Sequence, residues 1–226
     1  MNMFITIAII IILAILWYLL QPRLTCIKSK IDGNTYCVQK RSKTIINNKG
    51  DETSIIDMVR MQKSANLLSK VANNCTLLVH YMKLNYPDDS RTRLLLKRYN
   101  PNNIQEILPT SNHTAYSRSK GKSIAFCLNK YKSINNSISS TDENYKNVMS
   151  NAEQDVVDLQ TLTFVAIHEL AHVASVNHGH KQEFWDNFKF LLKCAEEGQI
   201  YKSSDYNQTP ESYCGMMITD NPNYSM

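Results

Sequence analysis

The sequence lacks any pair of cysteines in the C-x-x-C spacing of structural zinc sites, and its six cysteines are scattered over 226 residues. This excludes a zinc ribbon. A predicted β-hairpin runs from Thr25 to Gln39 and turns at Asp32-Gly33. A two-residue turn there would place Cys26 and Cys37 diagonally rather than opposite each other. We expect reduced cysteines, because the charge pattern below predicts a cytoplasmic domain.

The N-terminus also lacks the features of a cleaved signal peptide, since it has no basic residue before its apolar run and no small-residue cleavage site after it. Phe4 to Leu20 is apolar apart from Thr6. At about 1.5 Å per residue this run spans about 25 Å, close to the ~30 Å hydrocarbon core of a bilayer. We therefore predict a single-pass transmembrane anchor in residues 1–22, followed by one domain of residues 23–226.

Positive side chains are absent before the apolar run and follow it at Arg23, Lys28 and Lys30. The positive-inside rule then predicts that the domain lies on the cytoplasmic side, or at a viral membrane. Residues 21–130 carry 19 Lys and Arg against 7 Asp and Glu. This basic half could meet anionic lipids or nucleic acid. Its charges are dispersed, however, as on an ordinary solvated face, and no nucleic-acid-binding module is visible.

Glycine and proline are both absent from Leu159 to Val176, which is predicted to be one helix. It contains His168-Glu169-Leu170-Ala171-His172, the H-E-x-x-H pattern. Residues four apart share one helix face, so His168 and His172 can bind one zinc ion at about 2.0–2.1 Å. Glu169 can then take a proton from the water that the ion activates. The pattern predicts peptide-bond hydrolysis, and the alternative is a helix whose histidines are only hydrogen-bonded in the core.

A catalytic zinc site needs a third protein ligand and one open position. His178 follows His172 by six residues, as in the metzincin pattern, but Ser175 stands where that pattern has glycine. His180 is followed four residues later by Phe184, where a second helix is predicted to begin. Three kinds of third ligand stay open at this point: His180, His178, or a carboxylate such as Glu196 or Glu197.

The run HELAHVASVNHGHKQEFWDNFKFLL resembles the WLM and SprT-like (Spartan-type) zinc metallopeptidases. In that family a third histidine is followed four residues later by Phe or Trp. The resemblance implies that His168, His172 and His180 are the zinc ligands and that Glu169 is the catalytic base. It also implies an α+β, zincin-like fold, in which a small sheet packs on helices that include the motif helix.

Three shorter segments resemble short WLM-like proteins of large DNA viruses: Ala115–Ser117, Lys120–Leu128 and Tyr213–Met216. The second overlaps a predicted strand from Lys122 to Asn129. The resemblance gives that strand the role of the edge that aligns a substrate peptide. Other predicted elements are helices from Ser54 to about Tyr86, from Ser90 to about Tyr99 and from Phe184 to Ala195, and a polar loop from Tyr131 to Ala152.

These observations together predict a membrane-anchored zinc metalloendopeptidase that acts on proteins or peptides. Two other classes stay open. One is a catalytically silent, zinc-binding membrane or virion structural protein. The other is a protease that acts on nucleic-acid-associated proteins, because relatives in the resembled family digest proteins crosslinked to DNA.

Overall fold

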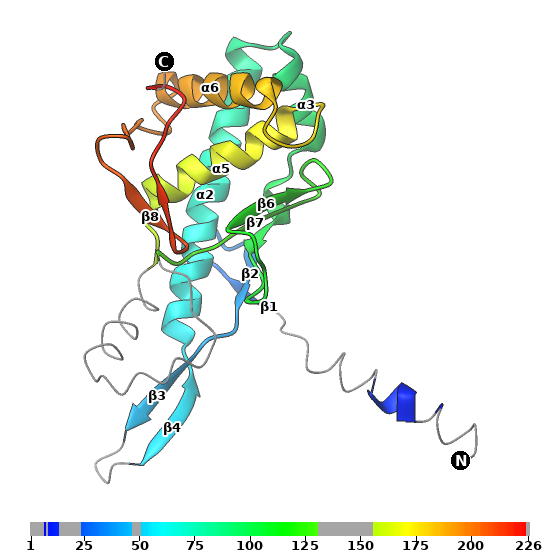
Figure 1. The fold of residues 1–226 in the computed structure, drawn as a ribbon, viewed down its shortest axis with the longest axis vertical. Coiled ribbons are helices and arrows are strands. Elements are labelled where there is room, and N and C mark those ends of the chain that lie inside the picture. Colours follow the sequence, from blue (N-terminus) through cyan, green and yellow to red (C-terminus); the bar gives the residue numbers. More distant parts are fainter. Residues whose placement is uncertain (1–6, 8, 14–23, 47–50, 131–155, 225–226) are drawn as a thin grey trace.

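The computed structural model describes residues 7, 9–13, 24–46, 51–130 and 156–224, and the predicted loop from Tyr131 to Ala152 lies outside them. The fold is α+β, as predicted (Figure 1). Its elements in chain order are β1 (Leu24–Lys28), β2 (Thr35–Gln39), β3 (Ser42–Ile46), β4 (Glu52–Ile56), α2 (Met58–Asn85), α3 (Ser90–Arg98), the short 3-10 helix η1 (Pro101–Asn103), β5 (Ile104–Glu106), β6 (Ala115–Arg118), β7 (Ser123–Phe126), α5 (Leu159–Ala174), α6 (Gln182–Glu197), β8 (Glu211–Tyr213) and β9 (Met216–Ile218).

The predicted membrane anchor requires a correction. Phe4 to Leu20 falls largely outside the described residues, and the part inside them, residues 7 and 9–13, is helical. A membrane-spanning helix needs about 20 apolar residues to cross the hydrocarbon core. Within the described part of the chain, no helix combines that length with that apolarity. The prediction of a single-pass membrane protein is therefore wrong on this structure.

Helices α2 and α5 each begin where an aspartate side chain satisfies a free backbone N–H group. Asp57 accepts a hydrogen bond from the Arg60 N–H at 2.9 Å at the start of α2, and Asp158 does the same for the Thr161 N–H at the start of α5. The predicted start of α2 at Ser54 is wrong. Residues 52–56 instead pair as β4 with β3, in a hairpin beyond the N-terminal end of α2 (Figure 1).

The β1–β2 hairpin has a different register from the one predicted, because its loop has six residues rather than two. Cys26 lies directly opposite Cys37, and the two form a disulfide. Asn66 on α2 stabilises this wider loop by accepting hydrogen bonds from the Lys30 N–H and the Ser29 hydroxyl. A second disulfide joins Cys127 to Cys214. The expectation of reduced cysteines is therefore wrong for these four.

Strand β7 is central in a three-stranded sheet of order β5-β7-β6, parallel to β5 and antiparallel to β6. This corrects the prediction that Lys122–Asn129 is the edge strand. The apolar run of β7 is buried on both sides, as a central strand requires, and includes Ile124, Ala125 and Phe126. Among the described strands, β6 is the edge on the side of α5.

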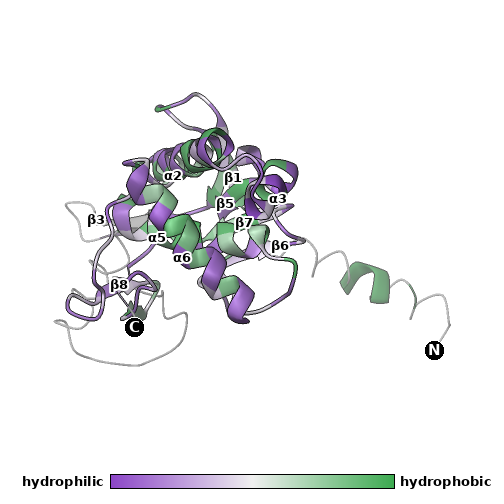
Figure 2. Ribbon diagram, turned by 90° about the horizontal axis from the view of Figure 1, so that it is seen from above, coloured by the Kyte–Doolittle hydropathy of each residue, from purple (hydrophilic) through white to green (hydrophobic). Residues whose placement is uncertain are grey.

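The core lies where α5 crosses α2 and packs on α6, with the three-stranded sheet at the other side of α5. Colouring by hydropathy shows apolar stretches of α5, β5 and β7 gathered towards the middle (Figure 2). A buried carboxylate joins the sheet to the first hairpin. Glu106 on β5 pairs with Arg41 at 3.0 Å and accepts the Gln39 N–H at 2.8 Å. These contacts join β5 to the first hairpin, which packs on α2.

The turn between β6 and β7 requires a glycine at position 121. This residue has φ +100°, and an added Cβ would lie 2.7 Å from the Arg98 carbonyl oxygen and 3.2 Å from Val173. We expect Gly121→Ala to lower the free energy of unfolding by about 3 kcal/mol, through the left-handed backbone and the backbone clash together. Chemical denaturation measures this loss.

Gly33→Ala is the matched control, because Gly33 also has positive φ but its added Cβ meets nothing closer than 3.7 Å. It should cost only about 1 kcal/mol. Equal losses for the two variants would contradict a close approach at Gly121.

Candidate metal centre

The H-E-x-x-H motif lies on the C-terminal half of α5, a helix that is buried around most of its circumference. The apolar residues that predicted this helix hold it against its neighbours, and Leu162, Leu170, Ala171 and Val173 are fully buried. His168 and His172 lie one turn apart with their ring centroids at 5.0 Å. Both rings face a cavity, so the helix can present two imidazoles to one metal ion.

The chain returns after α5 and brings His180 to the same point. Its Nε2 lies 3.2 Å from the Nε2 of His168. One ring nitrogen from each of His168, His172 and His180 lies within 4.8 Å of the others. Two nitrogens bound to one tetrahedral ion at about 2.05 Å would lie about 3.3 Å apart. The three imidazoles therefore form a group that could hold a metal ion.

Phe184, in the first turn of α6, forms the floor of this group. Its ring centroid lies 4.3 Å from that of His172 in a stacked arrangement, 4.6 Å from that of His180 and 4.8 Å from that of His168. A side chain in contact with all three rings limits their rotation and removes water from one side. The aromatic residue four positions after the third histidine thus packs beneath the predicted ligands.

The loop that carries His180 is held from its C-terminal side by Glu183. This carboxylate accepts hydrogen bonds from the Val176 N–H at 2.6 Å, the Asn177 N–H at 3.0 Å and the Asn177 side chain at 2.7 Å. The backbone donors of Val176 and Asn177 lower the pKa of Glu183. The resulting anionic clamp fixes the turn that precedes His180.

Two cations hold the same region at the C-terminus of α5. Arg98 donates from Nη1 to the carbonyl oxygens of Val173 and Ser175 at 2.8 and 2.9 Å. Lys120 donates from Nζ to the carbonyl oxygen of His172 in the last turn at 3.4 Å and to that of Asn177 beyond it at 2.5 Å. Helix C-termini leave carbonyl groups without partners and carry partial negative charge, so both contacts are favourable. Together they fix the end of the helix beside His172.

Burial keeps the two helical histidines neutral. Removal from water is the largest cause that lowers the pKa of His168 to about 3, and the neighbouring imidazoles of His172 and His180 lower it further. Desolvation, His180 and Lys120 lower the pKa of His172 to about 4. A metal ligand must present an unprotonated nitrogen. Both rings are therefore ready to bind a cation at neutral pH.

Glu169 is 4% exposed and lies on the face of α5 towards β6. Burial raises its pKa to about 7, against hydrogen bonds from the hydroxyl and backbone N–H of Ser117 that favour the ionised form. Its Oε2 is buried and has no hydrogen-bond partner among the described residues. A carboxyl group with a pKa near neutrality and a free oxygen can both accept and return a proton.

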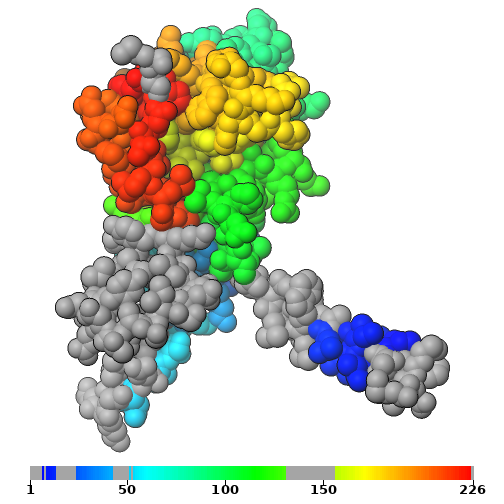
Figure 3. All heavy atoms as spheres, in the orientation of Figure 1, coloured from blue at the N-terminus to red at the C-terminus, as the bar shows by residue number. Residues whose placement is uncertain are grey.

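A cavity of about 750 Å³ opens in front of the histidines and Glu169. One wall is β6 with its preceding loop, and the opposite wall is the β8–β9 hairpin, which contributes Tyr213, Met216, Met217 and Ile218. In the space-filling view the C-terminal segment, red, and the β6 region, green, lie side by side below α6 (Figure 3).

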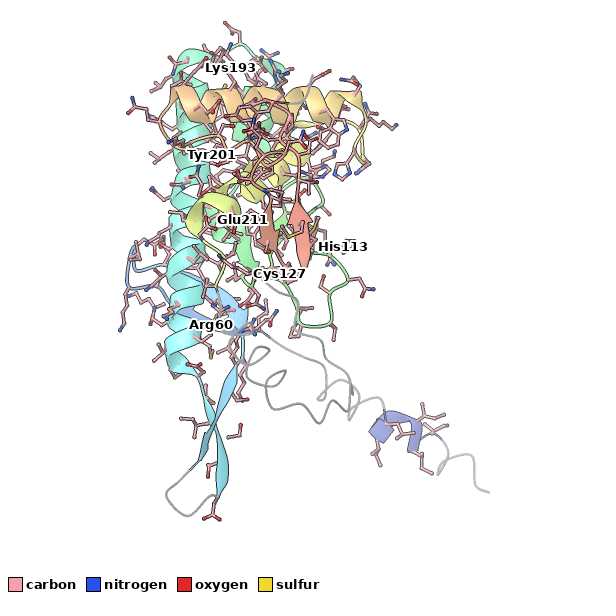
Figure 4. All side chains as sticks on the ribbon, turned by 60° about the vertical axis from the view of Figure 1, so that its left-hand side comes forward. Arg60, His113, Cys127, Lys193, Tyr201 and Glu211 are labelled. Atoms are coloured by element: carbon pink, nitrogen blue, oxygen red, sulfur yellow. A yellow bond between two sulfur atoms is a disulfide. The ribbon has the colours of Figure 1, made fainter. Side chains whose placement is uncertain are left out.

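The β8–β9 hairpin is attached to the sheet at several points. The Tyr213 hydroxyl donates to the Thr114 carbonyl oxygen at 3.0 Å, and the Cys214 N–H donates to that of Asn129 at 2.9 Å. The disulfide between Cys127 and Cys214 joins the same two segments (Figure 4). The β8–β9 wall of the cavity is therefore held by residues about 90 positions earlier in the chain.

The other predicted ligand candidates lie elsewhere. His178 is exposed and lines the cavity, but it is not part of the three-histidine group. Glu196 accepts hydrogen bonds from the Ser203 N–H and from Asn223, and Glu197 from the hydroxyls of Tyr81 and Tyr86.

Sequence reasoning missed the supporting residues Arg98, Lys120 and Glu183. Each acts on backbone atoms of another element, and no local pattern marks such a contact.

Metal content tests the ligand set. His168→Ala, His172→Ala and His180→Ala should each lower bound divalent metal from about one equivalent to about a tenth, because two imidazoles hold an ion weakly. His178→Ala should keep the full equivalent. Elemental analysis after dialysis measures the content, and circular dichroism checks folding. Metal loss in His178→Ala as complete as in His180→Ala would contradict this ligand set.

The clamp on the loop makes a separate prediction. Glu183→Ala should weaken metal affinity about tenfold while the stoichiometry stays the same, because the His180 loop loses three hydrogen bonds. Competition with a chromogenic chelator measures the affinity. Asp186→Ala should leave the affinity unchanged, because this carboxylate of α6 accepts its hydrogen bond, among the described residues, from Gln182 in the same helix. Equal effects of the two substitutions would rule out the clamp.

Comparison with known proteins finds one similar chain, and no family model and no solved structure match. A protein of Acanthamoeba polyphaga mimivirus, described by its name as uncharacterized, is 25% identical over 224 residues. The match covers 97% of this chain and 94% of the relative. The likeness thus extends over nearly the whole of both chains, and the relative's name carries no statement of activity.

Proposed function

We propose that this protein is a zinc-dependent peptidase that hydrolyses peptide bonds. The observation that carries the proposal is the convergence of three neutral imidazoles with a buried carboxyl group at one open cavity. The four side chains come from one helix and the loop after it, which is the arrangement that the H-E-x-x-H pattern requires. Membership of the WLM or SprT-like metallopeptidases is part of the same proposal.

Zinc is the metal that suits this donor set best. Three imidazole nitrogens with one position left open are typical of catalytic zinc sites, whereas calcium and magnesium prefer oxygen ligands. The 3.2 Å between Nε2 of His168 and Nε2 of His180 fits tetrahedral coordination at one ion. When bound there, zinc would supply a Lewis acid that acidifies a water molecule and polarises a substrate carbonyl group.

The free side of β6 suits a peptide backbone. The Cys127 N–H donates to the Thr114 carbonyl oxygen, so hydrogen bonding alternates and the backbone groups of Tyr116 and Arg118 face β7. The backbone groups of Ala115 and the carbonyl group of Ser117 then face away from β7, towards the open side, whereas the Ser117 N–H donates to Glu169. Among the described residues no strand pairs there. An extended peptide that adds to β6 would pass beside Glu169 and the histidines.

Glu169 would carry the proton in this reaction. Its free oxygen accepts a proton from the attacking water, and a pKa of about 7 lets it hold that proton and then return it to the leaving amine. Ser117 orients the carboxyl group from the adjacent strand, so proton transfer and substrate alignment share one edge of the sheet.

Glu169→Gln is the decisive variant. It should keep one equivalent of zinc, because no ligand changes, and should lower the rate of peptide hydrolysis by about a thousandfold, because an amide cannot accept the proton. A quenched fluorescent peptide library measures hydrolysis, beside elemental analysis for zinc. A chelator such as 1,10-phenanthroline should abolish wild-type activity, and zinc should restore it.

Two outcomes would contradict the proposal. Full hydrolysis by purified Glu169→Gln protein would remove the proton carrier from the mechanism. Wild-type protein that holds zinc yet cleaves no peptide in the library would favour the catalytically silent alternative.

A further inference from the structure

A second hollow, of about 440 Å³, adjoins at β6 the cavity in front of the histidines and Glu169. The two cavities share Asn112, His113, Tyr116 and Ser117 in their linings. The remaining lining residues of the second hollow are Leu108, Thr110, Ser111 and Arg118. We propose that this hollow is a substrate subsite that takes the acidic side chain of a bound peptide. The inference rests on the proposed peptidase function and names the substrate feature that the site selects.

The alternation of strand side chains places the hollow within reach of such a peptide. Ser117 contacts Glu169 and so projects to the face of the sheet that packs on α5. Tyr116 and Arg118 then project to the opposite face, because successive side chains of a strand point to opposite sides. A peptide strand paired with β6 follows the same alternation. Every second side chain would therefore point to the face of Tyr116 and Arg118.

The charges of the hollow select the chemistry of its occupant. Arg118 is exposed and carries the one permanent charge among its lining residues, which include no Asp or Glu. Arg118 forms no ion pair with a carboxylate of the described residues. A guanidinium group offers a planar fork of donors that matches a carboxylate with two parallel hydrogen bonds. The hollow is thus electrostatically complementary to Glu or Asp.

Tyr116 orients this charge. The Arg118 guanidinium carbon lies 5.8 Å from the centroid of the Tyr116 ring, within the range of a cation–π contact. The ring of His113 lies at 6.2 Å on an edge of Tyr116. His113 belongs to the loop before β6, beside the β8–β9 hairpin (Figure 4). The aromatic ring between the two side chains makes a shaped recess, in which the stem of an acidic side chain packs while its carboxylate meets Arg118.

The experiment uses peptides that differ at one position. A set of quenched peptides carries Glu, Gln or Lys at each position in turn on either side of the cleaved bond. Wild-type protein with zinc should cleave the Glu peptide about tenfold faster in kcat/KM than its Gln counterpart at alternate positions, and the Lys peptide more slowly still. Arg118→Glu should reverse this order. Lys122→Glu is the matched control, because it makes the same change in charge at an exposed residue outside both cavities, and it should keep the wild-type order.

Binding to the zinc-loaded Glu169→Gln protein separates the subsite from catalysis. Fluorescence anisotropy should show tighter binding of the Glu peptide, and adding Arg118→Glu to the same protein should remove the preference. If the order of peptides is the same with and without Arg118, the subsite is wrong, while cleavage by the wild type still supports the peptidase. If binding depends on Arg118 but the wild type cleaves nothing, the subsite stands and the peptidase fails. If no peptide is bound or cleaved, both are overturned.

Discussion

The packing of Phe184 beneath three imidazoles is the contact on which the candidate site depends. Its ring lies within 4.8 Å, centroid to centroid, of His168, His172 and His180. Because Phe184 belongs to the first turn of α6, the docking of α6 on α5 sets the position of the third histidine relative to the first two. A shift of α6 along α5 would leave a helix with two ligands, which cannot hold an ion firmly. The packing of the core and the geometry of the candidate metal centre therefore depend on the same contact between α5 and α6.

Burial has opposite effects on the pKa values of the histidines and of Glu169, and both effects suit the proposed hydrolysis. It lowers the pKa values of His168 and His172, since it disfavours the charged imidazolium. It raises the pKa of Glu169, since it disfavours the carboxylate. The imidazoles are then free to bind a cation and the carboxyl group is ready to exchange a proton. One desolvated surface on α5 accounts for both properties.

The cavity has two walls of different origin. Strand β6 belongs to a sheet that Glu106 and Arg41 join to the first hairpin. The β8–β9 hairpin comes from the end of the chain and is held by Tyr213 and by the disulfide between Cys127 and Cys214. The first wall offers an open strand edge and the second offers apolar side chains, among them Met216 and Met217. Under the proposed function, a peptide between these walls would be aligned by its backbone and selected by its side chains.

The sequence alone determined the helix that carries the motif, because residues four apart meet on one helical face whatever surrounds them. It also indicated the α+β class and narrowed the third ligand to a few residues. It left His178 open beside His180, which the family resemblance favoured, and it did not identify β6 as the edge strand. It also misplaced the hairpin register and predicted reduced cysteines where two disulfides form. Those features depend on contacts between distant segments, such as Glu183 on the turn before His180 and Asn66 on the hairpin loop. The tertiary structure decided them, because a local pattern records which face of a segment is apolar but not which partner covers it.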